Sequence, residues 1–144
     1  MEEIVSREYI ALENPDAVIK VVDASILERN LFFTIQLKEM EVPLVICLNQ
    51  LDSAKKGITI DTKKLEQALG VPVVPTVAIR GEGVYELTKK VVEVAKRKGA
   101  NRPKPIRYGD EIEEKIRELS TIIQSKKIVQ QYPARGVAVK LRAR

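Results

Sequence analysis

Three short apolar runs, rich in β-branched residues, constrain the fold of this chain more than any other feature. They span residues 17–22 (AVIKVV), 43–48 (PLVICL) and 71–76 (VPVVPT), and a segment with helix signals follows each one. Short strands that are apolar on both faces are typical of parallel sheets covered by helices. Alternating strands and helices favour right-handed crossovers within one sheet. The sequence therefore predicts an α/β fold with three parallel strands joined by crossover helices. Pro72 and Pro75 place the third strand at an edge, because proline cannot complete a central ladder.

Helix start and stop signals mark the segments around these runs. Ser25 and Glu28 fit a capping box, in which the serine caps the first turn and the glutamate reaches back, and they predict a helix to about Glu41. Asp61 predicts the start of a shorter helix that Gly70 ends. Two more helices are expected, over residues 2–13 and from Gly83 to about Arg97, the second with Val84, Leu87, Val91, Val92 and Val94 on its buried side.

A change of composition at residues 99–107 (GANRPKPIR) divides the chain. We expect a larger domain over residues 1–98, a linker over 99–107 and a short α-helical segment over 108–144. In the helical segment, Asp110 with Glu113 resembles another helix cap, and Pro133 is suited to open a last helix. The first of its helices has an amphipathic stripe made of Ile112, Ile116, Leu119 and Ile123.

The composition excludes several kinds of site. The chain has no histidine and one cysteine, Cys47, so Ser-His and Cys-His catalysis and most zinc sites are excluded. No apolar stretch approaches the ~20 residues that span a bilayer. The net charge is +5, with acid-free basic runs over residues 96–107 and 125–144. Such runs suit nucleic acid, an anionic membrane surface or a solvated linker. Because Tyr132 is the single aromatic residue within these runs and they offer no series of stacking platforms, we expect no nucleic-acid binding.

Open α/β sheets bind ligands at the carboxyl ends of their strands. The loops expected there are Asp23-Ala24-Ser25, Asn49-Gln50-Leu51-Asp52 and Val77-Ala78-Ile79. Guanine presents two adjacent donors that one carboxylate can accept together, whereas adenine presents an acceptor at that edge. A site of this kind rejects the wrong base by ~10⁴–10⁵. Asp52 is thus suited to read guanine, with Asn49 bracing the loop. By itself, however, Asn-x-x-Asp is equally an Asx turn with a helix cap.

A larger set of motifs resembles the G domain of the ferrous iron transporter FeoB family, from its middle to its end. These motifs are Val22-Asp23-Ala24-Ser25, Asn49-Gln50-Leu51-Asp52, Gly57 with Ile60-Asp61, residues 70–76 (GVPVVPT) and Gly81-Glu82-Gly83. Arg7-Glu8-Tyr9-Ile10 resembles the helix after the family's second switch. Downstream, residues 108–119 and Tyr132-Pro133-Ala134-Arg135 resemble the start of its helical regulatory domain. The resemblance covers nearly the whole chain.

The resemblance implies a cytoplasmic GTP-binding and GTP-hydrolysing domain, linked through a helical domain to a membrane core that transports ferrous iron. It assigns guanine specificity to Asn49-Gln50-Leu51-Asp52. It assigns a backbone contact with the base to Val77-Ala78-Ile79, where Val77 replaces the serine that is common in the family. GTP or GDP and Mg²⁺ are the implied ligands, although this sequence supplies no recognisable magnesium ligand.

The sequence contains no G-x-x-x-x-G-K-[ST] motif. Positioning and charge stabilisation of the phosphates supply nearly all catalysis in GTPases. We therefore expect the rear half of a G domain, a partial P-loop GTPase-like sheet without its phosphate-binding loop, which does not hydrolyse GTP alone. The strand over residues 17–22 then forms an open edge, which favours self-association or a complementing chain. The alternative is a non-enzymatic α/β protein-interaction module that uses this edge.

Overall fold

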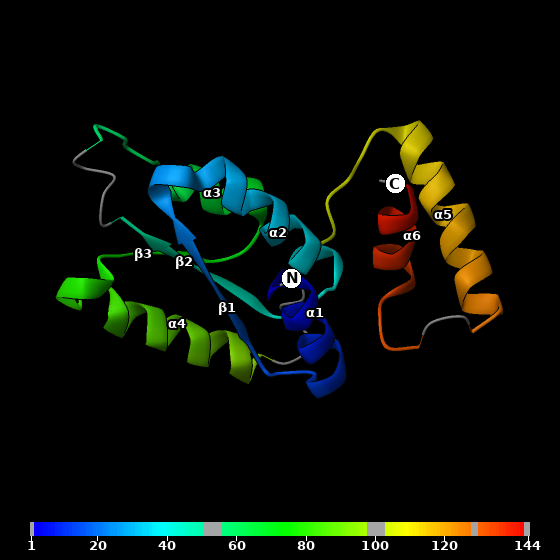
Figure 1. The fold of residues 1–144 in the computed structure, drawn as a ribbon, viewed down its shortest axis with the longest axis horizontal. Helices are drawn as coiled ribbons and strands as arrows, with labels where there is room; N and C mark the ends of the chain where they lie inside the picture. Colours follow the sequence, from blue (N-terminus) through cyan, green and yellow to red (C-terminus); the bar gives the residue numbers. More distant parts are fainter. Residues whose placement is uncertain (1, 51–55, 98–102, 128–129, 143–144) are drawn as a thin grey trace.

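The computed structural model describes residues 2–50, 56–97, 103–127 and 130–142 and has two lobes (Figure 1). The elements follow in the order α1 (Glu2–Glu13), β1 (Val18–Asp23), η1 (Ala24–Ile26), α2 (Leu27–Glu39), β2 (Leu44–Asn49), α3 (Thr62–Leu69), β3 (Val73–Thr76), η2 (Ala78–Arg80), α4 (Val84–Lys96), α5 (Asp110–Ser125) and α6 (Ala134–Arg142). Every predicted helix and strand is present, with ends shifted by one or two residues.

The three strands form one parallel sheet in the order β1-β2-β3. The central strand β2 is buried along its length apart from half-buried Asn49 at its end. The proline-containing strand β3 lies at one edge, as predicted, and β1 forms the other. The register places Asn49 opposite both Asp23 and Thr76, so the carboxyl ends of all three strands meet at one side of the sheet.

Helices cover both faces of the sheet (Figure 1). On one face, α2 and α3 bury an aliphatic core that includes Val22, Leu37, Leu44, Ile46 and Leu48, to which α1 adds Ile10. On the other face, α4 packs Val94 against Val45 and Val74. The prediction that Val84 and Val92 lie on the buried side of α4 is wrong, because both are largely exposed. Val92 lies on α4 outside the stripe of Leu87, Val91 and Val94 that contacts the sheet, whereas Val84 continues this stripe at the first residue of the helix.

The first cap prediction is also wrong. The Asp23 carboxylate accepts a hydrogen bond from the Ser25 backbone N–H at 2.8 Å, and the turn η1 intervenes before α2. Ser25 therefore lies inside a turn that Asp23 caps, and Ile26, at the true start of α2, makes no side-chain cap bond. The caps predicted for α3 are confirmed. Asp61 accepts from the Lys64 N–H at 3.1 Å, and Gly70 ends the helix with φ 64°.

The second lobe consists of α5 and α6, which pack on each other around Ile116, Ile123 and Ala138. Ile112, predicted on the same stripe, is 42% exposed because it lies at the open end of α5. The cap prediction at Asp110 is wrong, since Gly109 takes the cap position and Asp110 bonds to Arg107. Along the described ranges, no helix combines the length and apolarity needed to cross a bilayer.

Candidate functional site

The carboxyl ends of β2 and β3 carry the predicted nucleotide-binding residues. Asn49 is the last residue of β2, and the N–H of Gln50 donates to the Thr76 carbonyl at 2.8 Å, which ties this loop to the end of β3. Leu51 and Asp52 lie outside the described residues, so the role of the Asp52 carboxylate stays a prediction. The hydrogen bond from Gln50 to Thr76 nevertheless holds the end of β2 beside the loop that follows β3.

The structure brings two of the predicted segments into direct contact. The backbone N–H of Ala78 donates to the Asn49 side-chain oxygen at 3.4 Å. Val77 is half-buried beneath this contact, whereas Ala78 and Ile79 are exposed. Asn49, Ala78 and Ile79 therefore present an amide side chain and open backbone on one accessible surface. That combination suits the edge of a flat, hydrogen-bonding base.

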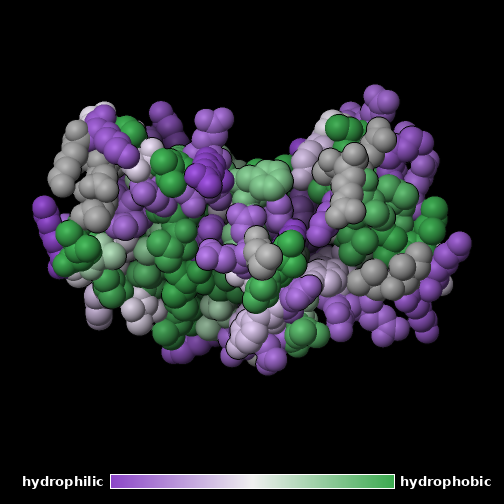
Figure 2. Space-filling view, in the orientation of Figure 1, coloured by the Kyte–Doolittle hydropathy of each residue, from purple (hydrophilic) through white to green (hydrophobic). Residues whose placement is uncertain are grey.

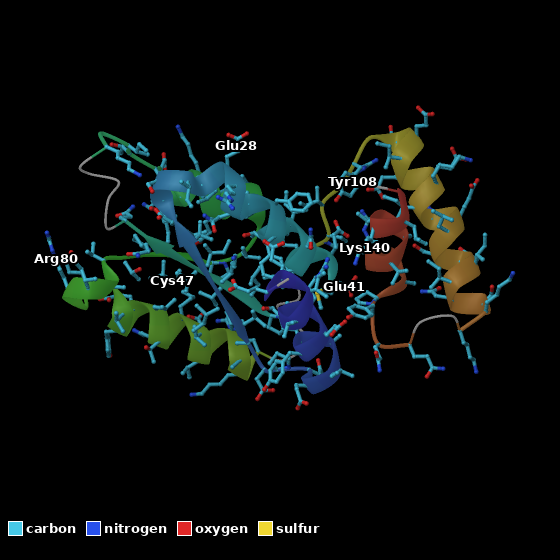
Figure 3. The ribbon with its side chains drawn as sticks, viewed as in Figure 1. Glu28, Glu41, Cys47, Arg80, Tyr108 and Lys140 are labelled. Atoms are coloured by element: carbon cyan, nitrogen blue, oxygen red, sulfur yellow. The ribbon has the colours of Figure 1, made fainter. Side chains whose placement is uncertain are left out.

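The loop after β3 is closed at its base. The Val77 N–H donates to the Glu82 carbonyl at 3.0 Å, and the Arg80 N–H donates to the Val77 carbonyl at 2.9 Å. Arg80 lies at the outer end of this loop (Figure 3), and its guanidinium is 3.6 Å from the Glu82 carboxylate. The sequence reasoning did not find this closure. The signal for it was the pair of glycines, Gly81 and Gly83, that precedes α4.

The end of β1 adds a carboxylate to the same side of the sheet. The hydroxyl and the backbone N–H of Ser25 hold the pKa of Asp23 below its ordinary value. Asp23 is thus an ionised acceptor, already engaged by the turn that it caps. In the part of the chain that the structure describes, no three His, Cys, Asp or Glu side chains are grouped as metal ligands.

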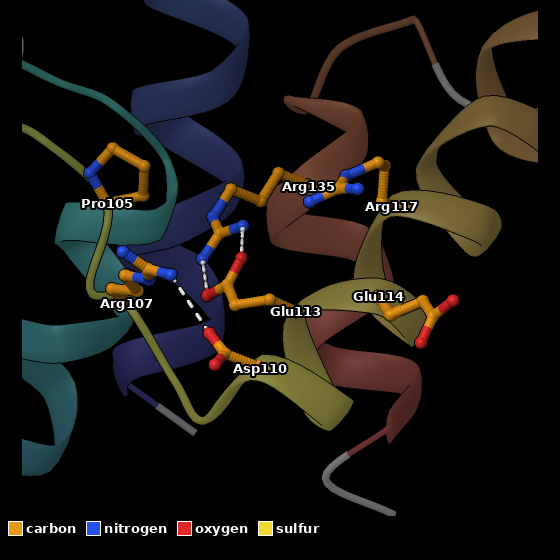
Figure 4. Close-up of a pocket in the computed structure, with 7 residues that line it drawn as sticks. All are labelled: Pro105, Arg107, Asp110, Glu113, Glu114, Arg117 and Arg135. Atoms are coloured by element: carbon orange, nitrogen blue, oxygen red, sulfur yellow. Dashed lines mark hydrogen bonds and ion pairs between the residues drawn. The ribbon is translucent and has the colours of Figure 1, made fainter.

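A second polar cluster lies between the lobes, away from the strand ends. The Arg135 guanidinium donates to both Glu113 carboxylate oxygens, at 2.9 and 2.8 Å (Figure 4). It also donates to the Ile106 carbonyl at 2.7 Å. Its Nε lies 3.4 Å from the Glu39 carboxylate, which is 5% exposed, and the Tyr108 hydroxyl donates to Glu39 at 3.3 Å. We call Glu39, Tyr108, Glu113 and Arg135 the interlobe cluster.

The pKa values of the two carboxyl groups in the interlobe cluster shift in opposite directions. Hydrogen bonds from Arg135 and from the Tyr108 N–H lower the pKa of Glu113 to about 2. Burial raises the pKa of Glu39, although Arg135 and Tyr108 oppose that effect. A cavity of about 480 Å³ adjoins Arg135 and Glu113, and one of about 640 Å³ lies between α1, α2 and α6. Neither cavity is lined by a residue of the strand ends, so the cluster joins the lobes rather than serving the candidate site.

Comparison with known proteins bears on the identity of the chain. The family model described as ferrous iron transport protein B matches residues 1–91. The Fe(2+) transport protein A/Fe(2+) transporter FeoB fusion protein of Porphyromonas gingivalis is 43% identical over 97% of this chain. The Fe(2+) transporter FeoB of Staphylococcus aureus strain MSSA476 is 36% identical over 96% of it. The chain spans only 17% and 21% of the lengths of these two relatives.

Solved structures match almost the whole chain, both lobes included. The cytosolic domain of the T. maritima FeoB iron transporter in its apo form matches 97% of this chain with a TM-score of 0.83 and 30% identity, and 54% of that domain is covered. The mGMPPNP-bound NFeoB of S. thermophilus also matches 97% with a TM-score of 0.83, at 36% identity and 51% coverage of that protein. The similarity therefore extends to the arrangement of the helices and the sheet.

Proposed function

This chain belongs to the ferrous iron transport protein B family, and from that membership we propose that it provides the base-recognition part of a guanine-nucleotide site. One observation carries the proposal: the Ala78 N–H and the Asn49 side chain meet at the carboxyl ends of adjacent parallel strands. Relatives in this family have been solved in GMPPNP and GDP forms. The ligand that fits both facts is a guanine nucleotide.

The residues divide into two groups by role. Asn49, Gln50, Leu51 and Asp52 form the segment that reads the purine edge, with Asp52 accepting from the ring N–H and the exocyclic amine. Val77, Ala78 and Ile79 form the loop whose backbone lies beside the guanine carbonyl oxygen, with the Val77 N–H bonded to the Glu82 carbonyl and the Ala78 N–H to the Asn49 side chain. Magnesium binding and hydrolysis stay outside the proposal, because the sequence holds no G-x-x-x-x-G-K-[ST] motif. What is proposed is discrimination between bases.

The cellular role follows from the family. We propose that the chain acts at the cytoplasmic face of the membrane, as the relatives described as cytosolic domains do. Its partner there is the transport core for ferrous iron. Residues 1–98 form the nucleotide-binding unit, 99–107 the connection and 108–144 a helical unit. The separate core of α5 and α6 supports this division.

A second candidate function uses the open edge of the sheet. On β1, Ile19 is 45% and Val21 57% exposed, and apolar side chains gather over this strand (Figure 2). An uncovered apolar edge strand pairs readily with another strand. We propose that β1 pairs with a second copy or a complementing chain. Sedimentation of the wild type should then show self-association that Val21→Lys abolishes, and a monomer over the whole micromolar range would refute pairing with a second copy.

Calorimetric titration with GDP, GTP and ATP tests the nucleotide proposal. Asp52→Ala is the test variant. Asp110→Ala is the matched control, because that carboxylate is exposed on α5 in the other lobe. Guanine-selective binding that Asp52→Ala abolishes and Asp110→Ala retains supports the proposal. An absence of nucleotide binding at millimolar concentration rejects it and favours the interaction module.

A further inference from the structure

Gly83 lies at the closest approach between the end of β3 and the start of α4. Its φ is +76°, in the left-handed region. A Cβ built there would lie 2.2 Å from the Pro75 carbonyl oxygen and 3.2 Å from the Thr76 Cα. Both neighbours are backbone atoms of the strand that carries the base-contact loop. No side chain fits at position 83 without moving this strand end or the helix.

The closed loop begins and ends at this approach. Val77, directly after β3, donates to the carbonyl of Glu82, the residue before Gly83. Ala78 and Ile79 thus lie in a loop whose two stems are held together by one backbone hydrogen bond and one backbone contact. A displacement of either stem moves Ala78 as well, since only four residues lie between Ala78 and Gly83 in this closed loop.

We propose that Gly83 is a positioning residue of the nucleotide site: by lacking a side chain it sets the distance between the Ala78 N–H and Asn49. The inference rests on the proposed function, and Gly83 itself does not contact the base. The Ala78–Asn49 distance is 3.4 Å, at the long end for a hydrogen bond. Any outward shift of the loop therefore breaks this contact and moves the Ala78 backbone and the Asn49 side chain out of the arrangement that faces the base.

The chain offers a matched control two residues away. Gly81 has φ +70°, so Gly81→Ala and Gly83→Ala carry a similar backbone cost. A Cβ at Gly81, however, meets nothing within 4 Å. Any difference in nucleotide affinity or hydrogen exchange between the two variants therefore reports the clash with Pro75, because the cost of a positive φ is shared by both.

Three measurements on the whole chain test the proposal. Gly83→Ala should weaken GDP binding roughly fivefold to tenfold, the value of about one hydrogen bond, more than Gly81→Ala does. Without nucleotide, Gly83→Ala should also speed hydrogen exchange at Val77 and shift the side-chain amide resonance of Asn49, and Gly81→Ala should do neither. Equal behaviour of the two variants in these measurements overturns the proposal.

Two further outcomes separate this proposal from the broader one. If the wild type binds no guanine nucleotide, the proposed function fails, while the exchange and resonance measurements still decide the role of Gly83. If Gly83→Ala does not fold, the wild type decides: saturating GDP should slow exchange at Val77 as well as at Ala78. Protection of Ala78 alone would show that the loop stem is not coupled to the site, and would refute the positioning role.

Discussion

Arg135→Ala should lower the free energy of unfolding more than any other single substitution in the interlobe cluster. The substitution removes the two hydrogen bonds to Glu113 and the charge beside Glu39. The Glu39 side chain is 5% exposed and would keep the Tyr108 hydroxyl, a backbone contact and the charge of neighbouring Lys38. A carboxylate in that position must either stay charged without the Arg135 counter-ion or take up a proton.

The loss of stability expected for Arg135→Ala follows from the burial of Glu39. Removing one partner of a buried pair costs ~3–5 kcal/mol. The Arg135 side chain is 22% exposed, so solvent screens part of the loss and we expect ~3 kcal/mol. Glu39→Gln should cost about 1 kcal/mol or less, because Arg135 keeps Glu113 and a neutral amide replaces a carboxylate that burial disfavours. Arg107→Ala, which breaks an exposed pair with Asp110, should cost under ~1 kcal/mol.

Urea unfolding followed by circular dichroism measures the free energy of unfolding of each variant. The dependence of that free energy on urea concentration is compared between variants, to confirm that each unfolds in the same way. Hydrogen exchange within α6 then shows whether the helical lobe has detached. The order Arg135→Ala, Glu39→Gln, Arg107→Ala, from largest loss to smallest, is the expected result. If Glu39→Gln destabilises as much as Arg135→Ala, the cost lies in the shape of the joint and the electrostatic reasoning is refuted.

Three further predictions concern the same lobes. Because the pKa of Glu113 falls from 4.5 to about 2 on folding, its contribution is full above about pH 4.5 and is lost as the pH falls toward 2; Glu113→Gln should remove that part of the acid unfolding curve. Leu37→Ala, in the sheet core, should cost ~2–5 kcal/mol in the same urea assay. Gly136→Ala should destabilise although alanine favours helix by ~1 kcal/mol, because its Cβ would lie 2.7 Å from the Glu39 carbonyl oxygen; a net gain in stability would contradict this.

The features that the sequence predicted correctly are those that neighbouring residues decide. Asp61 and Gly70 delimit α3 as expected, because a cap depends on atoms within one turn of the helix. The cap at Ser25 failed for a related reason: Asp23, two residues earlier, offers a carboxylate that captures the turn first. The sequence therefore predicts the start of a helix correctly where one cap residue precedes it, as at α3, and incorrectly where two precede it, as at α2.

The features that the sequence could not predict depend on what lies opposite a residue in space. Val84 has helical spacing from Leu87 and Val91 yet is 43% exposed, whereas Val94 is buried against the sheet. The contact between Glu39 and Arg135 joins residues far apart in the sequence, and the hydrophobic periodicity of the two helices does not predict it. In the candidate site, the choice of Asn49 and Ala78 came from strand order and resemblance, while their contact needed the register of β2 and β3.

The interlobe cluster specifies an orientation more than it supplies affinity. Glu39 occupies the last turn of α2, where the helix dipole disfavours a negative charge, and burial disfavours it again. Arg135 offsets both effects only while α6 lies against that turn, and Gly136 is what lets the α6 backbone come that close. Because a buried ion pair yields little net stability compared with apolar packing, such a joint holds one angle between the lobes without holding it tightly. The helical lobe thus keeps its own core in α5 and α6, and Arg135, the Tyr108 hydroxyl and the close approach at Gly136 position it on α2.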